Sequence, residues 1–271
     1  MQVKSHPCIH PYSIVVVEPV SAPVVLVTGA ARRVGAAIAR RLHGAGARVV
    51  LHYRHSQAEA DALAAALNAE RVDSAMTVQA SLNDPQALQS LVATTLARFG
   101  RLDGLVNNAS SFFRTPFGEI DEQGWDDLMG SNLKGPLFLS QAAAGALKAS
   151  GGGIVNITDI HASQPDRGYA TYTAAKAGLL GLTRALAVEL APQVRVNAVA
   201  PGVVEWPEGG EQLSEPVRRA IVDSTLLKRP GTPEDIARTV QFLLFDAPYI
   251  TGQVIHVDGG RSAHLSLPLS D

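Results

Sequence analysis

Short apolar runs alternate with longer segments of helical periodicity along most of the chain. The apolar runs are typical of β-strands, and they cover residues 24–28, 47–53, 75–80, 102–108, 153–158, 194–200 and 254–258. Between them, apolar residues recur three and four positions apart. This spacing predicts helices over residues 34–45, 57–70, 84–99, 124–149, 168–191 and 233–246. Asp84–Pro85 and Thr232–Pro233 both fit a helix start, because proline is favoured directly after the N-cap residue.

The alternation of strands and helices predicts an α/β fold. Strand runs such as VVLVT (24–28) are apolar at every position but the last, which suits strands buried on both faces. We therefore expect one Rossmann-like domain over residues 23–271, with a doubly wound parallel sheet of about seven strands flanked by helices on both faces. Residues 1–22 read as a flexible N-terminal extension. The least regular stretch, about 201–232, is expected to form a substrate loop.

The composition is that of an ordinary globular protein. Of 271 residues, 46% are hydrophobic and 18% charged, and the formal net charge is −2, so we expect neither nucleic acid nor a membrane as a partner. No apolar run is long enough to span a bilayer, and the lone cysteine, Cys8, favours a reducing, cytoplasmic location. His6, Cys8 and His10 lack a fourth ligand of clear spacing, so we expect no metal site.

A glycine-containing turn follows the first predicted strand. In TGAARRVG, Gly29 and Gly35 lie six residues apart, and the next predicted helix begins there. Gly29 allows a tight turn and Gly35 allows close packing of helix against strand. The helix N-terminus then offers free N–H groups to a pyrophosphate. The alternative is a glycine-containing turn that binds nothing, and its position after the first strand makes that alternative weaker.

The end of the second predicted strand indicates which dinucleotide is bound. Proteins that read the ribose 2′-hydroxyl of NAD usually have an acidic residue there, whereas this chain has the sequence HYRHS over residues 52–56. Arginine, histidine and serine are hydrogen-bond donors, and a 2′-phosphate requires donors. We therefore predict NADPH/NADP+ as the cofactor, with Arg33 reaching the same region or the pyrophosphate. A solvated basic strand end is the alternative.

A tyrosine and a lysine on one predicted helix suggest proton chemistry. Tyr172 and Lys176 are four residues apart, so their side chains share one face of the helix. An ammonium beside a phenol is expected to lower the pKa of the tyrosine and make it a usable acid near neutral pH. Asn132 follows the fourth predicted strand and Asp159 ends the fifth, so both belong to the edge where parallel sheets bind ligands.

Taken together, these motifs resemble the short-chain dehydrogenase/reductase superfamily. The order TGxxxxxG, NNA (107–109), Asn132, Y-x-x-x-K, NAVAPG (197–202) and GQVIHVDGG (252–260) covers residues 24–260. The resemblance implies catalytic roles for Asn132, Tyr172 and Lys176, and a homotetramer in which the long helices pack between subunits. It implies a cofactor site made of Gly29, Arg32, Arg33, Val34, His52, Tyr53, Arg54, His55, Ser56, Ser81, Leu82, Asn108, Ala109, Ser110, Tyr172, Lys176, Pro201 and Gly202.

Two departures from the superfamily pattern resemble the pteridine reductases. Asp159 stands where ordinary members have a catalytic serine, and Arg33 stands where they have glycine. The resemblance implies that Arg33 lies over cofactor and substrate together. It also implies reduction of a dihydropterin or dihydrofolate by hydride transfer to a ring carbon, with oxidised pterins as further candidate substrates. The substrate site would comprise Arg33, Ser110, Phe112, Asp159, Tyr172 and Trp206.

The chemistry of a C=N bond is consistent with a carboxyl group in place of the serine. Reduction of C=N puts a proton on nitrogen, and a carboxyl group with a raised pKa beside Tyr172 could feed that step. Phe112 would stack on a flat heterocycle, and Ser110 would hydrogen-bond its edge. Trp206 is equally compatible with loop packing, and Phe112 with core packing. Asp159 could instead be a turn residue that caps the next segment.

Two positions depart from the family pattern. An aspartate usually follows the third strand and holds the adenine amine, whereas this chain reads Ala80-Ser81-Leu82. That contact is expected to come from Ser81 and the backbone. Val204 stands where related parasite enzymes have a serine, so it is given no polar role.

Two rival functions remain open. The first is a reductase of ketones or 3-oxoacyl thioesters, which shares Tyr172 and Lys176 but not Asp159. The second is an NADP(H)-binding regulator without activity, whose usual mark, loss of the tyrosine or lysine, is missing here.

Overall fold

The computed structural model describes residues 22–206 and 213–263 and confirms the predicted fold class. One parallel sheet has the strand order β3-β2-β1-β4-β5-β6-β7. Its strands are β1 (Val24–Val27), β2 (Arg48–Tyr53), β3 (Ala75–Gln79), β4 (Gly104–Asn107), β5 (Gly153–Ile157), β6 (Arg195–Pro201) and β7 (Val254–Val257). The N-terminal extension, except residue 22, lies outside the described residues, and so do His6, Cys8 and His10.

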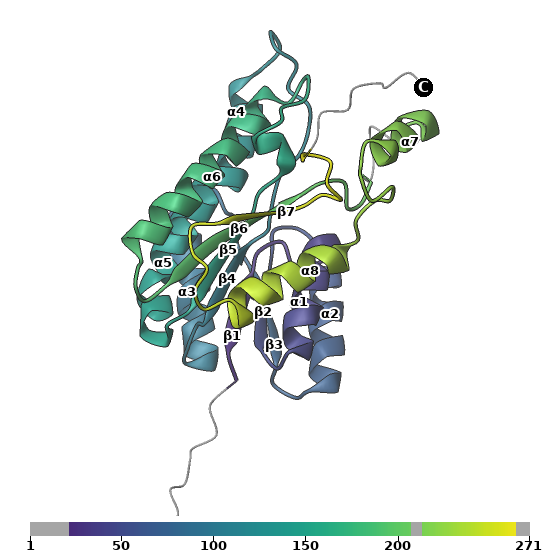
Figure 1. Ribbon diagram of the computed structural model, residues 1–271. Helices are drawn as coiled ribbons and strands as arrows, with labels where there is room; N and C mark the ends of the chain where they lie inside the picture. Colours follow the sequence, from purple (N-terminus) through teal and green to yellow (C-terminus); the bar gives the residue numbers. More distant parts are fainter. Residues whose placement is uncertain (1–21, 207–212, 264–271) are drawn as a thin grey trace, which may run out of the picture.

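Helices cover both faces of the sheet (Figure 1). One core cluster packs α1 (Arg33–Gly44), α2 (Gln57–Glu70) and α8 (Pro233–Gln241) on one face. The other packs α3 (Pro85–Phe99), α5 (Gly135–Ser150) and α6 (Ala170–Glu189) on the opposite face. Because both faces are covered, every residue of β1 and β5 is buried, as the apolar strand pattern predicts. None of the described helices is both long and apolar enough to cross a membrane.

The structure refines two predicted helices and adds one. The segment predicted as one helix over 124–149 consists of α4 (Glu122–Met129), a π-helical turn, η1 (Gly130–Lys134), and α5. Likewise, α8 ends in a second π-helical turn, η3 (Phe242–Asp246). Helix α7 (Glu215–Asp223) lies inside the region predicted as an irregular loop, and none of its residues is buried. A helix that buries no residue need not have a continuous apolar face, and this explains why the sequence pattern did not indicate it.

The strand order reverses next to β1, and this reversal places the site. β1 pairs in parallel with both β2 and β4, so the loops after these strands leave the sheet at its carboxyl edge. In doubly wound sheets, ligands bind in the crevice at such a switch point. The turn at Gly29, the segment after Asn107 and the residue Asp159 therefore reach the same edge, as predicted.

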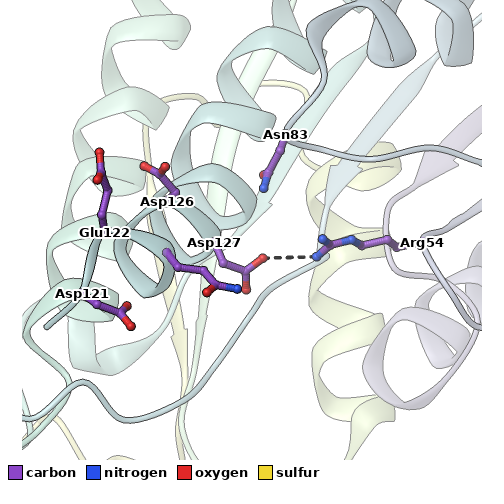
Figure 2. A pocket seen from close by; sticks show the side chains of 7 residues that line it. Arg54, Asn83, Asp121, Glu122, Asp126 and Asp127 are labelled. Atoms are coloured by element: carbon purple, nitrogen blue, oxygen red, sulfur yellow. Dashed lines mark hydrogen bonds and ion pairs between the residues drawn. The ribbon is translucent and has the colours of Figure 1, made fainter. Parts of the chain in front are cut away.

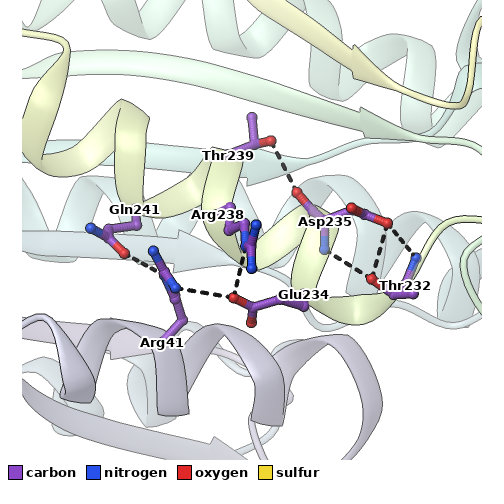
Figure 3. Close-up of polar contacts among 7 residues, drawn as sticks. All are labelled: Arg41, Thr232, Glu234, Asp235, Arg238, Thr239 and Gln241. Carbon is purple, nitrogen blue, oxygen red and sulfur yellow. Dashed lines mark hydrogen bonds and ion pairs between the residues drawn. The ribbon is translucent and has the colours of Figure 1, made fainter.

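Helix α8 is held by a capping box and by an ion pair and a hydrogen bond to α1 (Figure 3). The Thr232 hydroxyl accepts from the backbone N–H of Asp235 at 3.2 Å, and the Asp235 carboxylate accepts from the N–H of Thr232 at 2.8 Å. Arg41 of α1 donates to Gln241 and lies 3.2 Å from the Glu234 carboxylate. These contacts fix α8 under the loop that leads to the site.

Loss of the cap should destabilise the fold measurably. We expect Thr232→Ala to lower the free energy of unfolding by about 1 kcal/mol, because the N–H of Asp235 loses its acceptor. Urea unfolding followed by circular dichroism checks this. Thr232→Ser keeps the hydroxyl and should stay close to the wild type. Equal losses in both variants would contradict the capping explanation.

Candidate active site

The turn after β1 has no room for side chains at its two glycines. Gly29 has φ +61°, a conformation that favours glycine, and a Cβ there would lie 2.9 Å from the Cα of Ala109. A Cβ on Gly35 would lie 2.1 Å from the carbonyl oxygen of Gly29. The glycines therefore let the first turn of α1 approach the loop closely, which is the geometry that a phosphate loop requires.

The segment directly after β4 holds the same turn. The backbone N–H groups of Asn108 and Ala109 donate to the Thr28 hydroxyl at 2.9 and 3.0 Å. The side-chain amide of Asn108 donates to the carbonyl oxygens of Thr28 and Gly29 at 2.8 and 3.2 Å. The predicted cofactor residues Asn108 and Ala109 thus contact the phosphate loop directly, and they set its shape.

His52 is buried beneath the turn at Gly29 and is not an exposed donor. Its side chain is 1% exposed, its Nδ1 accepts from the Gly29 N–H at 3.2 Å, and its Nε2 lies 3.2 Å from the carbonyl oxygen of Ala80. Because the Gly29 N–H can only donate, Nδ1 is the acceptor and Nε2 must hold the proton. Burial lowers the pKa of His52 to about 4, so the ring is neutral. The prediction that His52 donates to a 2′-phosphate is therefore wrong.

Arg33 joins the turn after β1 to the loop after β6. It begins α1 with a positive φ of 52°, which is uncommon for a residue other than glycine. Its guanidinium donates to the Glu205 carboxylate at 2.7 Å and to the backbone carbonyl oxygens of Glu205 and Trp206 at 3.4 and 3.3 Å. The Trp206 ring also lies 5.3 Å from the guanidinium of Arg218 in α7. Arg33 therefore connects the start of α1 to the segment that contains Glu205 and Trp206.

Arg54 faces an acidic hollow beside the ends of β2 and β3 (Figure 2). Its guanidinium forms an ion pair with Asp127 of α4 at 3.2 Å. The hollow has a volume of about 750 Å³ and is lined by Arg54, Asn83, Asp121, Glu122, Gln123, Asp126 and Asp127. Arg54 thus lies directly after β2, and its guanidinium is paired with the Asp127 carboxylate. Arg32 is likewise near an acid, with 3.8 Å to Glu59.

The other predicted cofactor residues differ in exposure. Those with at least partial access at the carboxyl edge are Val34, His55, Ser56, Ser81, Pro201 and Gly202. The side chains of Tyr53 and Leu82 are 7% and 8% exposed and belong to the buried core. Because the side chains of Tyr53 and Leu82 are buried, only the backbone atoms of these two predicted residues could contact a cofactor.

Tyr172, Asp159 and Lys176 meet as predicted. The Tyr172 hydroxyl donates to Oδ2 of Asp159 at 2.8 Å. Lys176, one turn further along α6, donates from Nζ to the carbonyl oxygen of Ile157 at 3.0 Å and lies 5.7 Å from the Tyr172 ring centroid. Tyr172 is 4% exposed and Lys176 2% exposed, so water screens these charges little.

The ionisation states differ from the predicted ones. Burial and the Asp159 carboxylate raise the pKa of Tyr172 well above its usual value, although a hydrogen bond with Ser110 acts in the opposite direction. Burial lowers the pKa of Lys176 to about 8, although Asp159 favours its charged form. The net pKa of Tyr172 is therefore raised and not lowered as predicted, because burial and a carboxylate at 2.8 Å dominate.

Asp159 is ionised, contrary to the expectation of a raised pKa. Burial favours its protonated form, but His161 outweighs burial through a side-chain hydrogen bond, its charge and its backbone N–H, so the pKa of Asp159 is lowered. Nδ1 of His161 lies 3.1 Å from Oδ1 of Asp159, and the His161 N–H donates to the same oxygen at 2.8 Å. The site thus pairs a neutral phenol with a carboxylate.

Asn132 lies in the π-helical turn between α4 and α5. It is fully buried, and its amide donates to the carbonyl oxygens of Leu128 and Ser111 at 2.9 and 3.0 Å. Its Oδ1 accepts from the Ser110 hydroxyl at 2.6 Å. Such π-turns are frequent at functional sites. Here the turn places Asn132 behind the loop that holds Ser110, with Tyr172 on the other side of this serine.

Aromatic rings form one wall of the site. Phe112 is 44% exposed, which excludes the plain core reading. Its ring stacks on Tyr169 with centroids 4.8 Å apart and an interplanar angle of 8°, and it meets the Tyr172 ring edge-on at 4.8 Å. Offset and edge-on ring pairs are the favoured aromatic arrangements. The wall therefore offers a flat apolar surface directly beside the Tyr172–Asp159 pair.

Sequence reasoning missed three residues of this site. His161 could have been found, because a backbone N–H two residues after an aspartate commonly bonds its carboxylate. Tyr169 precedes Tyr172 by three residues and shares its helix face. Asp127 meets Arg54 only through the tertiary fold, so no local signal indicates it.

Comparison with known proteins gives matches over nearly the whole domain. Residues 29–262 match the profile of a family described as Enoyl-(Acyl carrier protein) reductase. Pteridine reductase 1 of Leishmania tarentolae is 41% identical over 283 residues, covering 89% of this chain and 97% of the relative. The 3-oxoacyl-[acyl-carrier-protein] reductase FabG of Staphylococcus aureus (strain Mu50 / ATCC 700699) is 38% identical over 238 residues, covering 87% and 96%.

A third relative belongs to the same group. The 3-oxoacyl-[acyl-carrier-protein] reductase of Synechocystis sp. is 39% identical over 244 residues, covering 89% of this chain and 97% of the relative. Profile, relatives, sheet order and the Tyr172–Lys176 pair agree with one another. The chain therefore belongs to the short-chain dehydrogenase/reductase superfamily and is an oxidoreductase.

Proposed function

We propose that this protein reduces pterins with NADPH, converting a dihydropterin or dihydrofolate to the tetrahydro form. The observation that supports the proposal most directly is the hydrogen bond from Tyr172 to Asp159 at 2.8 Å. The Asp159 carboxylate keeps the Tyr172 phenol protonated. The phenol can then donate this proton to a ring nitrogen of the substrate. The similarity to pteridine reductase 1 over 89% of the chain agrees with it.

Each site residue has a role in this reaction. Tyr172 protonates the ring nitrogen next to the reduced carbon. Asp159 orients the Tyr172 hydroxyl, and its negative charge draws a proton back to the phenolate after each turnover. We assign Lys176 to the nicotinamide ribose and, when charged, to stabilising the phenolate. Bound NADPH would supply the hydride.

Substrate recognition would come from the wall and the bridging arginine. Phe112 presents an apolar face to a planar ring, and Ser110 offers a hydroxyl at its edge. Arg33 brings donors to the place where the polar edge of a pterin would meet the cofactor. Trp206 belongs to this group because its carbonyl oxygen accepts from Arg33 at 3.3 Å. Asn132 supports Ser110 and a water-linked proton path.

The residues of the phosphate loop fit NADPH. No side chain caps the N-terminus of α1, so its first N–H groups can bind a pyrophosphate. A Cβ at Gly35 would close this cradle. Arg54, His55 and Ser56 are the donors closest to the end of β2 in sequence, and we assign them to the 2′-phosphate. Arg54 would have to exchange Asp127 for this phosphate.

A 3-oxoacyl-thioester or other carbonyl reductase is the second candidate. It is favoured by one observation: the 3-oxoacyl-[acyl-carrier-protein] reductases are 38% and 39% identical, close to the 41% of pteridine reductase 1. Tyr172 and Lys176 would serve both reactions. Purified protein offered NADPH with dihydrobiopterin, dihydrofolate or an acetoacetyl thioester in parallel separates the two candidates.

We also propose that the protein is a homotetramer in which α5 and α6 pack between subunits. Both helices expose apolar side chains on the monomer, including Leu137 at 36% and Val188 at 79%. Light scattering coupled to size-exclusion chromatography should give the mass of four chains. The mass of one chain would contradict the assembly.

Removal of either partner of the Tyr172–Asp159 pair should nearly abolish pterin reduction. We expect Asp159→Ala and Tyr172→Phe each to lower kcat by roughly 100-fold or more, because proton transfer loses its donor or its orientation. NADPH affinity, measured by fluorescence titration, should stay unchanged. Steady-state NADPH consumption gives kcat.

Asp159→Ser is the matched variant, because it restores the serine of ordinary superfamily members. It should lose activity on dihydropterin while any activity on the thioester persists or rises. Wild-type rates on dihydropterin in Asp159→Ala or Tyr172→Phe would overturn the roles assigned here.

Arg54 should distinguish NADPH from NADH. We expect Arg54→Ala to weaken NADPH binding about tenfold and to leave NADH binding nearly unchanged, because only NADPH has the 2′-phosphate. Asp127→Asn, which removes the competing carboxylate, should act in the opposite direction and tighten NADPH binding. Fluorescence titration of both cofactors checks this. Equal affinity of the wild type for NADPH and NADH would refute the assignment.

A further inference from the structure

His161 is not among the residues to which the predicted reaction assigns a role, yet it touches the site. It lies in the 3₁₀ turn η2 (Ile160–Ala162) directly after Asp159, and its side chain is 22% exposed. Two of its groups reach Oδ1 of Asp159: the backbone N–H at 2.8 Å and the imidazole Nδ1 at 3.1 Å. The other carboxylate oxygen, Oδ2, is left for the Tyr172 hydroxyl.

From this arrangement we propose that His161 is a positioning residue that acts through Asp159 and sets the acid strength of Tyr172 by its own charge. The inference rests on the proposed proton-transfer role of Tyr172. His161, Asp159 and Tyr172 form an unbroken chain of contacts in which one carboxylate oxygen faces the imidazole and the other faces the phenol.

The orientation part follows from the hydrogen bonds. A carboxylate can turn about its Cβ–Cγ bond, and two donors on Oδ1 prevent this rotation. Because Asp159 can only accept, Nδ1 of His161 must donate, whether the ring is neutral or protonated. A neutral imidazole therefore keeps the orientation, and protonation adds only charge. Orientation and charge can thus be separated by experiment.

The effect of the His161 charge follows from the loss of the Tyr172 proton during the reaction. When its proton goes to the substrate, a phenolate forms within hydrogen-bond distance of the Asp159 carboxylate, and two negative charges face each other. A protonated His161 offsets the carboxylate from the opposite side, so the phenol loses its proton at lower cost. A neutral His161 leaves only Lys176 to offset both anions.

Among the described residues, two other titratable groups face Asp159. These are Tyr172 and Lys176 of α6, and Asp159 favours the charged form of Lys176. Burial lowers the pKa of Lys176 to about 8, so its ammonium is lost as the pH rises through this value. A variant that keeps Lys176 but lacks the imidazole therefore separates the two contributions in a pH profile.

The first test compares kcat of the wild type with that of His161→Asn across the pH range. Asparagine can place an amide donor where Nδ1 lies but does not titrate. We expect wild-type kcat to fall as the pH rises, because histidine side chains lose their charge with rising pH. In His161→Asn this fall should be absent, kcat at pH 6 should be about tenfold lower, and the two profiles should approach each other near pH 8.

Several controls separate this role from a structural one. His161→Ala removes the donor as well, so its kcat should be lower than that of His161→Asn at every pH, while KM for the substrate stays within about twofold of wild type in both. Gln164→Ala removes a hydrogen bond to the Ser262 carbonyl near the same turn and should leave the profile unchanged. A pH-independent loss in His161→Asn, or an unchanged profile, would overturn the proposal.

A second measurement does not depend on which substrate is reduced. With ¹³C-labelled aspartate, the carboxyl carbon of Asp159, assigned from its loss in Asp159→Asn, reports the ionisation of this group. We expect its titration midpoint to move to higher pH in His161→Asn. An unmoved midpoint would overturn the proposal even if pterins are reduced. Turnover of the thioester but not of pterins, together with a moved midpoint, would refute only the proposed substrate.

Discussion

The hydrogen bond between the Tyr172 hydroxyl and the Asp159 carboxylate is the interaction on which the site depends. A buried phenol beside a carboxylate keeps its proton, because loss of this proton would bring two anions into contact in a poorly hydrated place. The phenol therefore gives up its proton readily only when a cation close to the pair offsets the negative charge. In the described part of the chain, Lys176 lies 5.7 Å from the Tyr172 ring centroid, and the His161 imidazole lies 3.1 Å from Asp159.

Such a pair requires that α6 be held rigidly against the sheet. A buried chain of side chains provides this support: Asn107 of β4 donates to Asn156 of β5 at 2.8 Å, and Asn156 donates to Thr183 of α6 at 2.9 Å. Buried polar networks that are fully satisfied favour one arrangement of the elements they join. Because Tyr172 and Lys176 are on the same helix, this network also fixes their distance from Asp159.

The fold could be predicted from the sequence because its signals are local. Each strand is a short apolar run, each major helix has its own periodicity, and the carboxyl edge follows from the parallel order. The two π-turns, η1 and η3, could not be predicted, because each adds one residue to a helical turn and leaves the pattern of apolar residues nearly intact. Helix α7 was missed because none of its residues is buried.

The sequence indicates part of the site but not its electrostatics. Tyr172, Lys176 and Asp159 follow from spacing, yet their ionisation depends on burial and on His161, which spacing does not indicate. His52 illustrates the same limit, because a histidine at a strand end reads as a donor and only the fold shows that both its nitrogens are used inside. Arg33 and Glu205 are 172 residues apart, so their ion pair has no local signal at all.

Three arginines around the turn after β1 each lie near a carboxylate. Arg32 lies near Glu59, Arg33 pairs with Glu205, and Arg54 pairs with Asp127. Partly exposed ion pairs of this kind contribute little to stability, so a phosphate can replace the carboxylate at small cost. Under the proposed function, NADPH binding would therefore exchange one anion for another. At Arg33 the same exchange would release Glu205, and it would link the loop that contains Glu205 to the presence of the cofactor.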